Sequence, residues 1–251
     1  MTTSTGLDIG APLSTPAGPP DPAADWVDLL KAVGLIWLAQ IVLSIPLFFL
    51  GGGSAPEYLE PHQLDPVALL AFGVATAGLT VFILWRFMCK KYGLGLLEGF
   101  GITRVNRDTW VQSATIGFVC AVVVGLVGSM VPAGNSYMAR LMSTPGGLLV
   151  VCFLAVLLPP VEELHYRGFI FPIARKYSGT AVAVTITAVW FTAAHVSQLA
   201  GDWLTLPFIF GVALVLTVQR QITGSLTPPM ISHWVYNMTL VAATLISSTW
   251  G

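Results

Sequence analysis

The chain has 251 residues, of which 55% are hydrophobic and only 9% are charged. A soluble domain carries about 25% charged residues, and a mean hydropathy of +0.79 means more apolar surface than one water-facing core can hide, so a soluble enzyme is excluded. A net charge of −1 leaves no basic face for phosphates, which excludes a nucleic-acid-binding protein.

The first 25 residues differ in composition from the rest of the chain. They hold five prolines separated by Ser, Thr, Gly and Asp, and such a segment buries too little apolar surface to fold. We expect a disordered, Pro-rich N-terminal tail over residues 1–25. No Lys or Arg precedes Lys31, so the tail does not resemble a cleaved signal peptide. The first helix is therefore expected to be an uncleaved membrane anchor.

Seven charge-free runs follow the tail, namely 32–56, 66–85, 109–139, 141–161, 177–201, 203–219 and 221–251. A helix needs about 20 apolar residues to cross the hydrocarbon layer, with a range of roughly 17–25. Helices are expected because they pair their backbone polar groups internally, and the short alternating segments of a membrane barrel are not visible. The sequence predicts an all-α, polytopic transmembrane helical bundle with about seven spanning helices, or eight if one is missed.

Basic residues recur in loops that fall on one side of this predicted bundle. Loop 51–65 is acidic, whereas the segment 86–108 contains five Lys or Arg, and later turns contain Arg175, Lys176 and Arg220. The positive-inside tendency makes the basic side cytoplasmic, with the N-terminus inside and, for seven spans, the C-terminus outside. We expect an integral multi-pass protein of the plasma membrane, in contact with the lipid bilayer.

Charged residues interrupt the apolar background in the segment 159–168, where Glu162, Glu163, His165 and Arg167 follow two prolines. A charge at the centre of a spanning helix costs about 2.5–3.5 kcal/mol on insertion scales, so such residues usually serve a function. Arg167 lies four residues after Glu163 and can form an ion pair with it on one helix face. Glu162 is then left to act as a general base. The alternative is an interfacial loop with solvated charges.

Two later apolar segments carry further polar residues. His195 ends one of them, and His233 and Asn237 are four residues apart on one face of another. A lone membrane histidine often bonds a neighbouring helix, but together with Glu162 these residues are interpreted as one site. If the chain turns near 178–179, two antiparallel helices place Glu162 and His195 at similar depth.

The three blocks together resemble the CPBP family, which comprises the type II CAAX prenyl endopeptidases and the bacteriocin-processing or immunity proteins, also called Abi. The family pattern is E-E-x-x-x-R, F-x-x-x-H and H-x-x-x-N on successive helices, which stand here at 162–167, 191–195 and 233–237. The resemblance covers about residues 145–245, and the first 140 residues match only as generic spanning helices. His165 and Tyr166 depart from the pattern, in which two hydrophobic or aromatic residues are expected at 165–166.

The resemblance implies an intramembrane, metal-independent glutamic endopeptidase that needs no cofactor. Carried over by position, Glu162 would be the general base on water and His195 would help to orient and activate that water. His233 and Asn237 would form the oxyanion hole. The substrate would be a membrane-associated peptide or protein, such as a prenylated CAAX-like tail or a leader peptide.

The resemblance also divides the chain. Residues 26–140 are expected to form N-terminal transmembrane helices, and residues 141–251 a CPBP-like catalytic core. Within this core, Glu163 and Arg167 would support the site by holding the helix that carries Glu162.

Two other functions compete with the glutamic endopeptidase. A glutamate and two histidines can bind a catalytic zinc ion, although the sequence has no H-E-x-x-H motif to indicate a zinc protease. The other competitor is a non-catalytic membrane protein, either an immunity or scaffold protein or a transporter. A transporter is expected to show repeat symmetry, and none is visible in the sequence.

Overall fold

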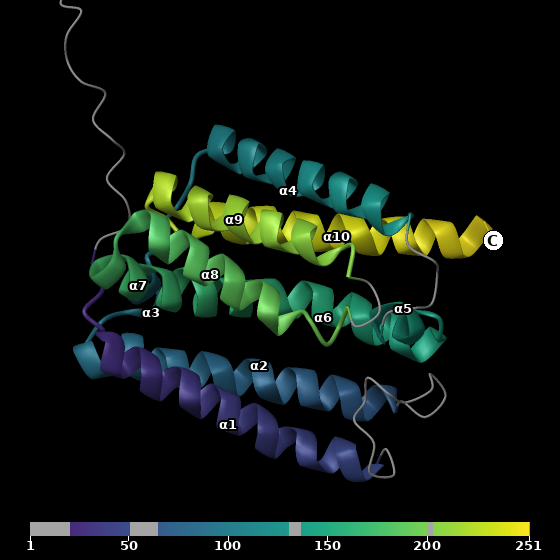
Figure 1. The fold of residues 1–251 in the computed structure, drawn as a ribbon, viewed down its shortest axis with the longest axis horizontal. Helices are drawn as coiled ribbons and strands as arrows, with labels where there is room; N and C mark the ends of the chain where they lie inside the picture. The colour runs from purple at the N-terminus through teal and green to yellow at the C-terminus, as the bar shows by residue number, and fades with distance from the viewer. Residues whose placement is uncertain (1–20, 51–64, 131–136, 200–202, 251) are drawn as a thin grey trace, which may run out of the picture.

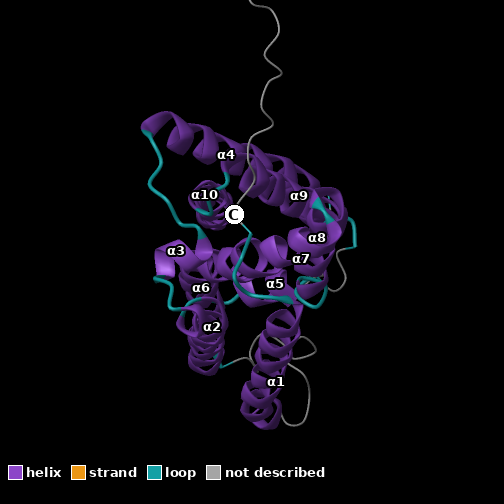
Figure 2. Cartoon of the chain, turned by 90° about the vertical axis from the view of Figure 1, so that its left-hand side faces the viewer, coloured by secondary structure: helices purple, strands orange, loops and turns teal. Residues whose placement is uncertain are grey.

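The computed structural model describes residues 21–50, 65–130, 137–199 and 203–250, in which all regular structure is helical (Figures 1 and 2). The helices are α1 (Trp26–Leu50), α2 (Pro66–Met88), η3 (Lys90–Tyr92), α3 (Leu96–Phe100), α4 (Arg107–Gly128), α5 (Tyr137–Met142), α6 (Pro145–Glu163), η4 (Leu164–Ile170), α7 (Phe171–Ser178), α8 (Thr180–Ala194), α9 (Leu206–Thr223) and α10 (Thr227–Trp250). The predicted all-α class is confirmed. The predicted tail up to residue 20 and most of the acidic loop lie outside the described residues.

Five helical runs within the described residues are long and apolar enough to cross a membrane: Trp26–Leu50, Pro66–Tyr92, Arg107–Gly128, Gly146–Ser178 and Leu206–Thr223. The predicted count of about seven is therefore not confirmed. Helix α8 has only 15 residues, fewer than the roughly 17 that a span needs. The charge-free run that predicted it also contains the end of α7 and the irregular residues after Ala194, because uncharged turns look like helix when only charges are counted.

The long helices lie roughly parallel or antiparallel to one another and form a bundle (Figure 1). Along the bundle α1 packs on α2, α2 on α6, α6 on α10, and α10 on α4. Helices α7, α8 and α9 pack in succession beside this row, and α9 returns to α10. Helix α10 therefore contacts α4, α6 and α9 and lies at the centre of the C-terminal half.

Helix α4 approaches α10 closely because its buried face carries small residues. A Cβ atom added at Gly117 would lie 2.1 Å from the backbone oxygen of Ser232. Only glycine, which has no Cβ atom, avoids this steric clash. One turn earlier, the Ser232 hydroxyl donates a hydrogen bond to the Ser113 carbonyl at 2.8 Å. Small residues and hydroxyls are the usual means by which helices pack in a membrane.

The basic loops gather at one end of the bundle, on the left in Figure 1, as the alternation of helices predicts. At this end Lys91 forms an ion pair with Asp28 at 2.6 Å, and Arg175 forms one with Asp21 at 2.8 Å. Arg220, which the sequence places in a turn, lies instead in the last turn of α9 and is only 3% exposed. That this end faces the cytoplasm stays a prediction.

The turn predicted near residues 178–179 is present and joins α7 to α8. Helix α7 ends at Ser178, and Gly179 adopts φ +77° and ψ 168°, a conformation that is essentially restricted to glycine. Helix α8 then returns antiparallel to α7 and packs against it. This hairpin positions His195, at the end of α8, relative to the glutamates that precede α7.

Candidate active site

The two glutamates lie where α6 continues into a π-helical turn, η4, and then into α7. Glu162 is the midpoint of the 33-residue apolar run Gly146–Ser178, and its side chain is 23% exposed. The Glu163 side chain is fully enclosed, and every residue of η4 is buried. Single π-helical turns inside α-helices occur frequently at functional sites.

Glu163 forms the ion pair with Arg167 that the four-residue spacing predicts. Their Oε1 and Nη1 atoms are 2.8 Å apart, and both side chains are fully buried. Helix α9 satisfies the other guanidinium nitrogens, since Nε donates to the Thr217 hydroxyl at 3.2 Å and Nη2 to the Ala213 carbonyl at 3.1 Å. A buried charge pair needs such additional hydrogen bonds to offset the loss of its hydration.

His233 lies between the two glutamates. Its Nδ1 atom is 2.8 Å from Oε1 of Glu163, and its Nε2 atom is 3.5 Å from Oε2 of Glu162. Because the Glu163 carboxylate accepts from Arg167 and can only accept when ionised, Nδ1 of His233 carries the proton of their hydrogen bond. The five-residue separation of Glu162 from Arg167 predicts a glutamate without a charged neighbour. In the structure Glu162 instead faces the opposite edge of the imidazole that Glu163 holds.

His195 joins this cluster through Phe191. The His195 Nδ1 atom lies 2.8 Å from the Phe191 carbonyl, and since a carbonyl only accepts, Nδ1 donates and Nε2 is left as an acceptor. The buried Phe191 ring stacks on His195 at 4.5 Å and meets the edge of His233 at 5.7 Å. The Arg167 guanidinium lies 4.5 Å from the centre of the same ring. One aromatic ring thus contacts three of the polar side chains.

Asn237 lies one helical turn after His233 on α10, as its spacing predicts. Its side chain is half-buried, and within the described part of the chain its amide has no hydrogen-bond partner. Asn237 is therefore placed next to the cluster with two unused N–H donors.

The sequence did not identify the contributions of α9. Thr217 and Ala213 carry no motif that marks them as partners of Arg167. Arg220 had a visible signal, a single charge directly after a long apolar run, but that signal is also typical of a loop residue at the membrane surface. Its burial could be found only from the three-dimensional arrangement.

The described residues contain no group of three or more His, Cys, Asp and Glu side chains that is placed to hold a metal ion. The zinc alternative requires His233 as a ligand. In the structure both nitrogens of His233 face carboxylates, and Nδ1 is already engaged by Glu163.

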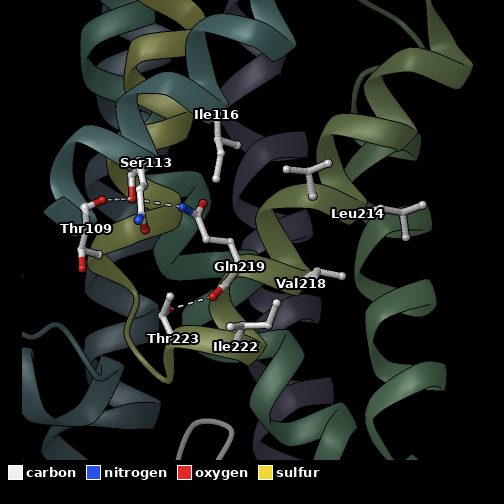
Figure 3. A pocket seen from close by; sticks show the side chains of 10 residues that line it. Thr109, Ser113, Ile116, Leu214, Val218, Gln219, Ile222 and Thr223 are labelled. Atoms are coloured by element: carbon white, nitrogen blue, oxygen red, sulfur yellow. Dashed lines mark hydrogen bonds between the residues drawn. The ribbon is translucent and has the colours of Figure 1, made fainter. Parts of the chain in front are cut away.

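A separate cavity of about 420 Å³ lies between α4 and α9. Figure 3 shows its mainly apolar lining, which includes Val218 and Ile222, and the hydrogen bond of 3.1 Å from the Gln219 amide to the Ser113 hydroxyl. The lining contains neither the two glutamates nor the histidines or asparagine of the candidate active site.

Comparison with protein families finds a match over residues 144–239, to the family described as type II CAAX prenyl endopeptidase Rce1-like. Comparison with curated proteins and with solved structures finds no match. The matched segment contains all three motif blocks, so the resemblance based on them is confirmed for this part of the chain.

Proposed function

Since residues 144–239 match the Rce1-like type II CAAX prenyl endopeptidases, a family of proteases, we propose that this chain is an intramembrane endopeptidase in which a glutamate activates water. The observation that carries the proposal is the difference between the two adjacent carboxylates. Glu163 is enclosed and neutralised by Arg167, whereas Glu162 is partly exposed and, within the described residues, contacts only the His233 edge at 3.5 Å. A general base must be accessible to water and not already paired.

In the proposed first step, the Glu162 carboxylate takes a proton from a water molecule as the water oxygen adds to the peptide carbonyl carbon. The carbonyl π electrons move to its oxygen, which becomes an oxyanion. Nε2 of His195 is an acceptor and holds the second water hydrogen. In the next step the C–N bond breaks, and Glu162 returns its proton to the leaving amine. General acid–base catalysis of this kind contributes about 10²–10⁴-fold.

The proposed oxyanion hole consists of Asn237 and His233. The unused Asn237 N–H groups suit this role, because preorganised donors are most effective in a site from which water is excluded. Nδ1–H of His233 is held by Glu163, so donation from Nε2 to an oxyanion requires an imidazole that carries both protons. Glu163 thereby fixes which edge of His233 faces the reaction.

The proposed substrate is a peptide presented at the membrane. A prenylated, CAAX-like C-terminal tail is the first candidate, because the matched family is described by that activity. A leader peptide is the second candidate, following the bacteriocin-processing branch that the motifs resemble. In both cases the scissile bond must enter the bundle to reach Glu162, which lies at the midpoint of its spanning run.

Cleavage assays with the purified full chain in lipid nanodiscs test this function. The peptides carry either a prenylated CAAX-type tail or a leader sequence, and the variants are Glu162→Gln and, as a matched control, Glu98→Gln on the exposed surface of α3. We expect Glu162→Gln to lower kcat by about 10²–10⁴-fold and Glu98→Gln to cleave normally. Normal cleavage by well-folded Glu162→Gln would overturn the mechanism.

A further inference from the structure

The π-helical turn η4 leaves one backbone carbonyl without a regular helical partner. In an α-helix the Arg167 carbonyl would accept from the N–H of Phe171, four residues later. Here the Phe171 N–H donates instead to the Tyr166 carbonyl, five residues back. The π pattern then assigns the Arg167 carbonyl to residue 172, which is Pro172 and has no N–H. A buried carbonyl without a donor is costly, so a partner from elsewhere is needed.

Arg220 on α9 supplies that partner. Its Nε atom donates to the Arg167 carbonyl at 3.3 Å, and Nη2 donates to the Phe100 carbonyl at 3.3 Å. Nη1 donates to the Gly224 carbonyl. Arg220 is 3% exposed, and within the described residues it forms no ion pair with a carboxylate. A buried guanidinium that binds three carbonyls of three different segments acts as a connector rather than as a surface charge.

We infer that Arg220 is a positioning residue of the active site, which holds η4 in its π-helical form and thereby fixes the two glutamates relative to Arg167 and His233. Without Arg220, the Arg167 carbonyl regains a donor most readily if the turn closes to α geometry. The Phe171 N–H then donates to the Arg167 carbonyl instead of the Tyr166 carbonyl. That closure rotates α6 against α7. It displaces the carboxylate of Glu162 from the edge of His233.

The inference rests on the proposed function for its effect on catalysis but not for its effect on structure. A displaced base slows the chemical step, whereas contacts that bind the peptide elsewhere are unchanged. Since misplacement by about 1 Å can lower the rate by about 10²-fold, Arg220→Ala is expected to lower kcat by about 10–10²-fold with little change in KM.

Pro172 provides the decisive experiment. Pro172→Ala restores an N–H at the position from which a π-helix donates to the Arg167 carbonyl. In this background the Arg167 carbonyl no longer depends on Arg220, so Pro172→Ala should restore most of the kcat lost in Arg220→Ala. Pro207→Ala, at the exposed start of α9, is the matched control and should restore nothing. If Arg220 acted only through the Phe100 and Gly224 carbonyls, Pro172→Ala would not restore kcat, and this result would contradict the inference.

Melting temperatures of the same four proteins, wild type, Arg220→Ala, Pro172→Ala and the double variant, test the inference without any assay of cleavage. The fall in Tm caused by Arg220→Ala should be smaller when Pro172→Ala is present. If Pro172→Ala reduces the fall in Tm caused by Arg220→Ala but no variant shows detectable cleavage, the role of Arg220 is supported and the proposed function is contradicted. Equal losses in both backgrounds would overturn the role of Arg220. If Arg220→Ala does not fold, Arg220→Lys, which retains the charge but only one donor group, replaces it in the same cycle.

Discussion

His233 and Glu163 share a hydrogen bond of 2.8 Å between Nδ1 and Oε1, and the same carboxylate oxygen accepts from Arg167. Oε2 of Glu163 is buried and has no hydrogen-bond partner among the described residues. Both donors therefore converge on one atom. The ion pair and the orientation of His233 depend on each other, so a change at Arg167 should be detectable in both stability and catalysis.

The first prediction concerns the buried ion pair. Arg167→Ala should lower the free energy of unfolding by about 3–5 kcal/mol, because it leaves the Glu163 carboxylate buried and unpaired. The double variant Glu163→Gln with Arg167→Met should recover most of this loss, since neither charge remains. It should still cleave poorly, because His233 has lost its carboxylate partner. Chemical unfolding in detergent and the cleavage assay measure the two effects, and an unchanged unfolding free energy in Arg167→Ala would contradict the pairing.

The second prediction separates the oxyanion role of Asn237 from a structural one. Its amide has no partner within the described residues, so Asn237→Ala should leave Tm nearly unchanged while lowering kcat by about 10²–10³-fold. Asn237→Asp should be worse, since a carboxylate would place negative charge beside the oxyanion. Asn106→Ala is a control with the opposite expected result, a loss of stability without a loss of activity. Its side chain caps α4 by accepting from the Thr109 N–H at 2.8 Å, so its loss should cost about 1 kcal/mol of stability but no activity.

Melting curves and steady-state kinetics on these three asparagine variants decide the matter. If Asn237→Ala melts far below the wild type and the remaining folded protein keeps a normal kcat, then Asn237 serves to hold helices together and the oxyanion assignment is wrong.

The third prediction concerns metal dependence. Because Glu162 and His195 are proposed to activate water without a Lewis acid, dialysis against o-phenanthroline should leave the cleavage rate unchanged. The metal content of the same preparation is measured by mass spectrometry. Stoichiometric zinc, with activity lost on its removal and regained on its return, would favour the zinc protease instead.

The fourth prediction concerns the turn between α7 and α8. An added Cβ at Gly179 would meet no other atom within 4 Å, so any cost of Gly179→Ala comes from its backbone conformation alone. That cost should be of order 1–3 kcal/mol. Gly34→Ala, also in open space but inside α1, should instead be neutral or stabilising by about 0.5–1 kcal/mol. Equal effects of the two substitutions on unfolding would contradict the strain at Gly179.

The sequence predicts the local relationships of the site well. Residues four apart on a helix, such as Glu163 with Arg167, share a face whatever surrounds them, and the ion pair follows from that spacing. The turn at Gly179 is likewise local, because only glycine adopts its backbone conformation readily. Scarcity of charge predicts a helical membrane bundle, since charge and helix length are properties of single segments.

The relationships between helices are not predictable in this way. Whether His233 meets Glu162, Glu163 or both depends on the rotation of α10 against α6, which no spacing within either helix encodes. The π-helical turn leaves no mark on the sequence apart from Pro172, whose missing N–H matters only once the turn is known. The sequence places Arg220 in a basic turn at the end of an apolar run, and its burial depends on the packing of α9 beside η4, which the sequence does not show.

The packing of α4 on α10 also has a consequence for the order in which the protein assembles during synthesis. Asp28 and Lys91, which join the start of α1 to the end of α2, are separated by 63 residues, so this pair can form early. Ser113 and Ser232 are separated by 119 residues. At about 5–20 residues per second, α4 therefore waits about 6–24 s in the bilayer before the helix that covers its small-residue face has been made.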